Sequence, residues 1–192
     1  AALRALEAAP GFPSALLALA LAEPGGAPGL AVPAPSEGAR GLASVQLKNF
    51  VARRWRSRPG AAVPPVPEVE KAALRGALVE GLAGARGSDL VARQVAIALA
   101  KVARCDWPAQ WPDLFDAFVA RLRQALAAGR PEAALRLLRG LHHALKELAS
   151  KRLAADKRSF HALAGQLLPV LRGAWVGAAQ EVAGLAEGLA AP

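Results

Sequence analysis

Two tryptophan–proline pairs within ten residues constrain the fold of this chain more than any other feature. The segment from Cys105 to Leu114 reads Cys-Asp-Trp-Pro-Ala-Gln-Trp-Pro-Asp-Leu, between two segments of helical periodicity. Proline lacks a backbone N–H and fixes φ, so it ends the helix before it and can occupy the first turn of the next. The segment therefore predicts a rigid helical corner filled by aromatic side chains, with Trp111 and Pro112 in structural roles.

The composition favours an all-α protein. Of the 192 residues, 54% are hydrophobic; alanine and leucine are abundant, whereas β-branched and aromatic residues are scarce. A chain of this length can bury one core or form several units of a repeat array. It contains no methionine, so its first residue is not an initiator, and we expect it to be a fragment of a longer protein.

The sequence contains no pattern typical of a catalytic, cofactor or metal site. The single cysteine, Cys105, excludes an internal disulfide framework, and the three histidines lack the spacing of zinc ligands. Asp106 and Asp113 do not form a carboxylate pair, because the intervening prolines direct them to different helix ends. No apolar run approaches the roughly 20 residues that span a bilayer. We therefore expect neither an enzyme nor a cofactor, a metal or a membrane partner.

Helical periodicity recurs with a nearly constant spacing. Paired helices begin near residues 37, 89, 131 and 178, and these intervals are close to the roughly 40–47 residues of HEAT-type repeats. We expect an all-α HEAT-repeat solenoid, an α–α superhelix of about four helix pairs. Its units are a truncated first repeat at about 1–22, a second at 36–84, a third at 88–128, a fourth at 131–176 and the start of a fifth at 178–192, with loops at 23–35 and 56–67.

Local patterns predict how individual helices begin, end and pack. Ser36 and Ser88 are expected to cap the helices that follow them, and Pro169 is expected to kink a helix that ends near Trp175. A separate final helix is expected over about 180–190. The predicted apolar faces are Leu74, Leu78 and Leu82; Val91, Val95, Ala98 and Val102; and Ala134, Leu138, Leu141, Leu145 and Leu148.

Four segments resemble the importin-β superfamily of karyopherins. The segment from Arg40 to Trp55, which contains Leu-Lys-Asn, is similar to the N-terminal signature of that family. The pattern Asp-x-Pro-x-x-Trp-Pro-x-Leu at 106–114 is similar to the corner of the family's third repeat. The segments 94–104 and 149–156 resemble its importin-11 branch. The resemblance extends from Leu3 to about Trp175.

The resemblance implies an N-terminal fragment of a nuclear transport receptor. Such receptors bind the small GTPase Ran in its GTP form through their N-terminal repeats and carry protein cargo through the nuclear pore, shuttling between nucleus and cytoplasm. Ran's switch loops order only around the γ-phosphate, so a surface that contacts them distinguishes GTP from GDP. The implied partners are Ran-GTP, protein cargo and nucleoporins, the last through sites outside this fragment.

The resemblance also marks candidate contacts with Ran: Lys48 and Asn49, Arg53 and Arg54 further along the same helix, and a partly exposed Trp107. Each has a structural or solvated alternative: Lys48 and the arginines can be solvated surface charges, Asn49 can satisfy local backbone, and Trp107 can fill the corner. The branch-typical segment adds three basic residues to which the resemblance assigns no role: Lys151, Arg152 and Lys157.

The net charge of +9 leaves alternatives open. Basic residues cluster at 53–58 and again at 146–158, which is typical of nucleic-acid-binding proteins. Tyrosine is absent and aromatic residues make up only 5%, so surfaces for base stacking are scarce. We expect no direct nucleic-acid partner. The alternatives are a basic helical-repeat RNA-binding protein and a non-catalytic scaffold.

Overall fold

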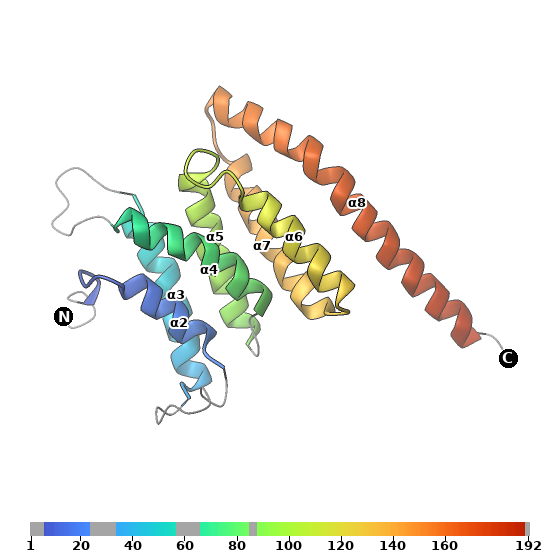
Figure 1. Cartoon of the computed structure of the whole chain (residues 1–192), viewed down its shortest axis with the longest axis horizontal. Helices are drawn as coiled ribbons and strands as arrows, with labels where there is room; N and C mark the ends of the chain where they lie inside the picture. The colour runs from blue at the N-terminus through green and yellow to red at the C-terminus, as the bar shows by residue number, and fades with distance from the viewer. Residues whose placement is uncertain (1–5, 24–33, 57–65, 85–87, 191–192) are drawn as a thin grey trace. The chain divides into compact units, whose positions relative to one another are not determined.

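The computed structural model describes residues 6–23, 34–56, 66–84 and 88–190. The predicted loops at 23–35 and 56–67 lie largely outside these residues. All regular structure in the described part is helical, which confirms the all-α solenoid class. The helices are α2 (Phe12–Leu21), α3 (Glu37–Arg54), α4 (Glu68–Gly84), α5 (Asp89–Asp106), α6 (Leu114–Ala127), α7 (Pro131–Ala149) and α8 (Ala154–Ala190) (Figure 1).

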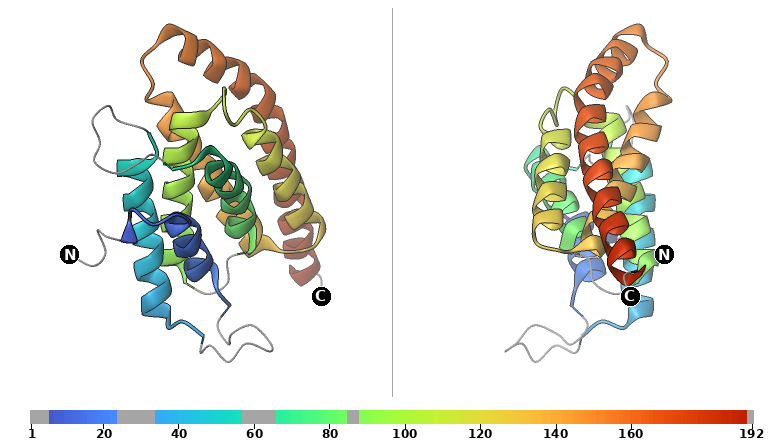
Figure 2. Two further views of the ribbon diagram at one scale, coloured as in Figure 1. Left: turned by 60° about the vertical axis from the view of Figure 1, so that its left-hand side comes forward. Right: turned by 90° about the vertical axis from the view of Figure 1, so that its right-hand side faces the viewer.

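The chain divides into two compact units, residues 1–148 and 149–192. In the first unit, α2 to α7 form two layers (Figure 2). One layer contains α3 and α5, with α7 joined to α5 by ion pairs; the other contains α2, α4 and α6, and α2–α3 and α4–α5 contacts connect the layers. This arrangement of stacked helix pairs is typical of an α-solenoid, in which each pair covers the apolar face of its neighbour.

The predicted apolar faces of α4 and α5 form the centre of the core. Leu74, Leu78 and Leu82 of α4 are at most 2% exposed. The predicted face of α5, which includes Val91 and Val95, is fully buried. Helix α5 contacts both α3 and α4. Its many alanine side chains are small, so both neighbouring helices can approach it closely. The 3.6-residue period therefore predicted these two faces correctly.

The predicted inner face of α7 is partly wrong. Leu138 is 40% exposed, whereas Leu137 is buried together with Leu141 and Leu148. A Cβ atom at Gly140 would overlap Leu82 of α4 and lie 3.3 Å from the Phe118 ring of α6. Close packing at this glycine accompanies the burial of Leu137 in place of Leu138, a choice that the leucine pattern alone does not make.

The helix α8 also differs from the prediction. It runs from Ala154 to Ala190 as one continuous, gently curved helix through Pro169 (Figure 1). The separate helix expected over 180–190 is therefore wrong, and no turn marks the expected start of a fifth repeat near 178. The axis of α8 changes direction along its length (Figure 2), and the kink expected at Pro169 stays a prediction. An interior proline removes a single backbone donor, and the alanine- and leucine-rich sequence around it favours the helix.

The two predicted serine caps have different outcomes. The hydroxyl oxygen of Ser36 accepts a hydrogen bond from the Ala39 backbone N–H at 3.2 Å, which confirms the first cap. Ser88 precedes α5 with extended backbone, but its side chain makes no capping hydrogen bond. The cap position was therefore correct at both helices, and the cap interaction only at the first.

Replacing Ser36 with alanine is expected to lower the free energy of unfolding by about 1 kcal/mol, because the first turn of α3 loses a hydrogen-bond acceptor. Ser88→Ala is the matched control and is expected to change it by less than about 0.5 kcal/mol. Urea unfolding of both variants, followed by circular dichroism, measures the difference. Equal losses would contradict a stabilising role for the Ser36 cap.

Candidate functional site

The helix α3 presents the main candidate residues. Leu47, Phe50 and Val51 are buried, and α3 contacts both α2 and α5. This packing leaves Lys48 and Asn49 half-buried at the border of the buried face. Within the described part of the chain, neither side chain makes a hydrogen bond or an ion pair. Their polar groups therefore lie at the surface of α3 without an internal partner among those residues.

The start of the same motif has a structural role. Arg40 is 3% exposed, and its Nε donates a hydrogen bond to the backbone oxygen of Ala20 at 3.2 Å. Ala20 lies in the last turn of α2, where backbone oxygens have no partner within the helix. Arg40 thus joins the end of α2 to the beginning of α3, so the motif contains at least one residue that serves the fold.

Arg53 and Arg54 are paired within the chain. The Arg53 Nη2 lies 2.6 Å from Glu7 Oε1, and the Arg54 Nη2 lies 3.7 Å from Glu7 Oε2. The Glu7 side chain is only 8% exposed, whereas that of Arg53 is 55% exposed. The arginines are therefore not merely solvated: they join the end of α3 to the segment that precedes α2.

Both tryptophans of the corner are buried. Trp111 is 5% exposed, as expected of a structural residue. Trp107 is 8% exposed, and its ring meets Phe115 edge to face at a centroid distance of 5.6 Å. The expectation that Trp107 is partly exposed is therefore wrong, because the first turn of α6 covers it. A side chain in this position is not an accessible anchor for a partner.

A buried polar cluster below the corner was not predicted from the sequence. The carboxylate oxygen Oδ2 of Asp106 accepts hydrogen bonds from Trp55 Nε1 at 2.9 Å and from Arg75 Nε at 2.8 Å. Arg75 Nη2 also donates to Glu68 Oε1 at 2.6 Å. The cluster connects the C-terminal end of α3 with α4 and α5. Its residues Asp106, Arg75 and Trp55 are all buried.

The charges of this cluster stabilise one another. Burial alone would lower the pKa of Arg75, but its hydrogen bonds to Asp106 and Glu68 more than offset that effect and raise its pKa. The hydrogen bond from Arg75 in turn lowers the pKa of Glu68. Both shifts favour the charged forms. The cluster is thus an ion pair with satisfied hydrogen bonds, which suits a structural role at the corner.

The branch-typical basic residues lie around the start of α8, in the second unit. Lys151 Nζ lies 3.2 Å from Asp156 Oδ1, across the turn that precedes the helix. Arg152 and Lys157 are exposed. The pairing of Lys151 gives it a local role in this turn, and the role of the other two stays open.

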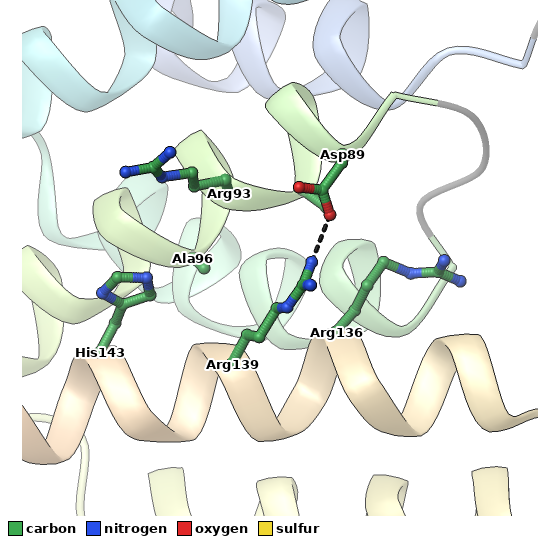
Figure 3. Close-up of a pocket in the computed structure, with 7 residues that line it drawn as sticks. Asp89, Arg93, Ala96, Arg136, Arg139 and His143 are labelled. Carbon is green, nitrogen blue, oxygen red and sulfur yellow. Dashed lines mark hydrogen bonds and ion pairs between the residues drawn. The ribbon is translucent and has the colours of Figure 1, made fainter.

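A second group of basic residues surrounds a hollow between α5 and α7 (Figure 3). The sequence did not single out these residues, because none belongs to a recognised motif. The only local signal is the spacing of two arginines three residues apart, which places them on one face of α7. The lining residues are Asp89, Ala92, Arg93, Ala96, Arg136, Arg139 and His143.

Among the residues that the structure describes, no group of three or more His, Cys, Asp or Glu side chains is placed to hold a metal ion. None of the described helices is long and apolar enough to cross a membrane.

Comparison with known protein families finds two adjacent matches. Residues 33–83 match the importin-beta N-terminal domain, and residues 88–163 match the family described as Exportin 1-like protein. The first match contains α3 and α4; the second contains α5, α6, α7 and the beginning of α8.

Several curated proteins are similar to this chain. Importin beta-like protein kap113 of Schizosaccharomyces pombe is 34% identical over 133 residues, which are 69% of this chain and 13% of that protein. Importin-11 of Mus musculus is 36% identical over 125 residues, 65% of this chain and 12% of the relative. Importin beta-like protein KAP120 of Saccharomyces cerevisiae is 28% identical over 132 residues, 69% of this chain and 12% of the relative. The chain thus spans only a small part of the length of these relatives.

Proposed function

This chain belongs to the importin-β superfamily of karyopherins, and on that premise we propose that it forms part of a nuclear transport receptor that binds Ran-GTP and carries protein cargo through the nuclear pore. The match of residues 33–83 to the importin-beta N-terminal domain is the observation that carries the proposal. The relatives named importin-11 and importin beta-like protein support the same class of function. A receptor of this kind shuttles between nucleus and cytoplasm.

We place the proposed Ran contact on α3, around Lys48 and Asn49. Both lie inside the matched domain, both reach the surface, and neither has a partner in the part of the chain that the structure describes. Recognition of a nucleotide state requires a preformed surface against the switch loops of the GTPase, and it requires no catalytic group. A rigid helix held by buried Leu47 and Phe50 provides such a surface.

Arg53 and Arg54 have a weaker claim to direct contact. Glu7 already pairs with both guanidinium groups, so an acidic residue of Ran would have to displace it. We propose that these arginines primarily hold the segment before α2 against the end of α3. The proposed contact does not include Trp107, because this side chain is buried.

Lys48→Glu is expected to weaken binding to Ran-GTP about tenfold, because reversing a charge at a complementary interface introduces repulsion. The measurement is equilibrium binding of the 192-residue chain to Ran loaded with a non-hydrolysable GTP analogue or with GDP. Wild type should prefer the GTP form. Arg123→Glu is the matched control: it makes the same change in net charge at an exposed position on α6 and should leave binding unchanged.

Two results would contradict this proposal. Equal affinity of the folded chain for Ran-GTP and Ran-GDP would show that these repeats do not contact the switch loops. An equal effect of Lys48→Glu and Arg123→Glu would show that only net charge matters. If RNA bound with a strong dependence on salt under the same conditions, the RNA-binding alternative would be favoured instead.

A further inference from the structure

The hollow between α5 and α7 has a volume of about 280 Å³, enough for one or two side chains of a partner. Its floor includes Ala92 and Ala96 of α5, which are at most 5% exposed. These small side chains leave room between the helices, and longer polar side chains surround that room (Figure 3). The hollow is lined only by residues of the first unit.

Positive charge dominates the lining. The lining residues include three arginines and one carboxylate, that of Asp89, which pairs with Arg139. Arg93 extends from α5 at the same side of the hollow as His143 (Figure 3), and it makes no hydrogen bond or ion pair with the described residues. The guanidinium of Arg136 points away from these groups in Figure 3 and lies 3.7 Å from Glu132. Arg139, beside Asp89, and Arg93, on the side of His143, are therefore the groups best placed to meet an anion, each from its own side of the hollow (Figure 3).

The Asp89–Arg139 pair already shows which anion fits. The carboxylate of Asp89 is joined to the Arg139 guanidinium across the hollow, from the first turn of α5 to α7 (Figure 3). Both side chains are half-exposed or more, at 73% and 50%. Exposed ion pairs contribute little to stability, so a carboxylate from another molecule can replace Asp89 at low cost. The planar guanidinium fork suits a carboxylate with two oxygens.

The pKa of His143 is lowered by burial and by the positive charges around the hollow. Burial is the main cause that lowers its pKa, and the nearby charges of His142, Arg93 and Lys146 lower it further, against an opposite effect of Glu147. Both causes favour the uncharged imidazole. A bound carboxylate would offset the positive charges, so the pKa of His143 should rise when the hollow is occupied.

We propose that this hollow binds a glutamate or aspartate side chain from an acidic segment of a protein partner, held by Arg93 and Arg139, with Asp89 as the internal group that it displaces. The lining contains no aromatic side chain except the imidazole of His143, so it offers little for the base stacking by which single-stranded nucleic acids are held. None of the proposed Ran contacts on α3 lines the hollow, so this inference is independent of the function proposed above.

The probe for this site is a fluorescein-labelled hexaglutamate peptide, and the measurement is fluorescence anisotropy with the 192-residue chain at low and moderate salt. Arg93→Gln and Arg139→Gln are each expected to weaken binding about three- to tenfold. Asp89→Asn is expected to strengthen it by a similar factor, because the internal competitor loses its charge. Arg123→Gln on α6 is the matched control and should have no effect.

The gain expected from Asp89→Asn keeps the test independent of folding, because a damaged protein would not bind more tightly. Nuclear magnetic resonance titration of the histidines adds a local readout, because the pKa of His143 should rise when the peptide is bound. Binding that is unchanged in all three variants would overturn the proposal. Displacement of the peptide by a uridine oligonucleotide at lower concentration than by unlabelled peptide would overturn it in favour of nucleic acid.

Discussion

Replacing Asp106 with alanine is expected to lower the free energy of unfolding by about 3–5 kcal/mol. The carboxylate accepts hydrogen bonds from Trp55 and Arg75, and the Asp106 and Arg75 side chains are each only 9% exposed. Without it, a buried guanidinium loses its main counter-charge and the indole N–H loses its acceptor. Breaking one partner of a buried pair is costly because the other charge stays desolvated. Urea unfolding followed by circular dichroism measures the loss.

Asp113→Ala is the matched control, because it removes an exposed carboxylate from the same corner, seven residues further along. It is expected to change stability by less than about 0.5 kcal/mol. The double variant Asp106→Ala, Arg75→Met should lose less than the sum of the two single variants, because it removes both charges together. A loss below about 1 kcal/mol in Asp106→Ala would contradict a stabilising role for the cluster.

Trp111→Ala is the second substitution with a large expected effect, a loss of about 3–5 kcal/mol in the free energy of unfolding. Trp111 is 5% exposed in the corner between α5 and α6. Truncation removes the buried indole and leaves a cavity, which the corner cannot fill because prolines hold its backbone on both sides. Thermal and urea unfolding of the 192-residue chain measure this loss.

Trp175→Ala makes the same chemical change at a residue that is 75% exposed and is therefore the matched control. It is expected to alter stability by less than about 0.5 kcal/mol. Similar losses in the two variants would contradict the assignment of Trp111 to the core.

Phe115→Leu removes the edge-to-face aromatic contact with Trp107 and should lower the free energy of unfolding by about 1 kcal/mol, in line with the value of one aromatic pair. The same unfolding measurements test this intermediate loss.

The features that sequence analysis predicted correctly are those set by neighbours along the chain. The buried faces of α4 and α5 follow from apolar residues spaced by one helical turn. The corner at Trp111 follows from prolines, which constrain the backbone wherever they occur. The cap at Ser36 follows from a hydroxyl three residues before a free backbone N–H. The family resemblance rested on the same local segments.

Two of the wrong predictions concern choices between locally similar options. Leu137 and Leu138 are adjacent and equally apolar, and contact of Gly140 with Leu82 and Phe118 decides which one is buried. Trp107 and Trp111 occupy matching Trp-Pro pairs, and the position of Phe115 covers the first. These contacts depend on where other helices lie, so a pattern within one helix could not reveal them.

The sequence by itself therefore determined an all-α repeat protein, most of its helices, the apolar faces of α4 and α5 and the rigid corner, because periodicity, capping and proline geometry act over a few residues. The resemblance to the importin-β superfamily was likewise present in the sequence alone. Only the tertiary structure decided which polar atoms meet. Trp55 and Asp106 are 51 residues apart in the chain, and Asp89 and Arg139 are 50 apart. Hydrogen bonds and ion pairs act over a few ångströms, so both the buried cluster and the basic hollow exist only after the helices have stacked.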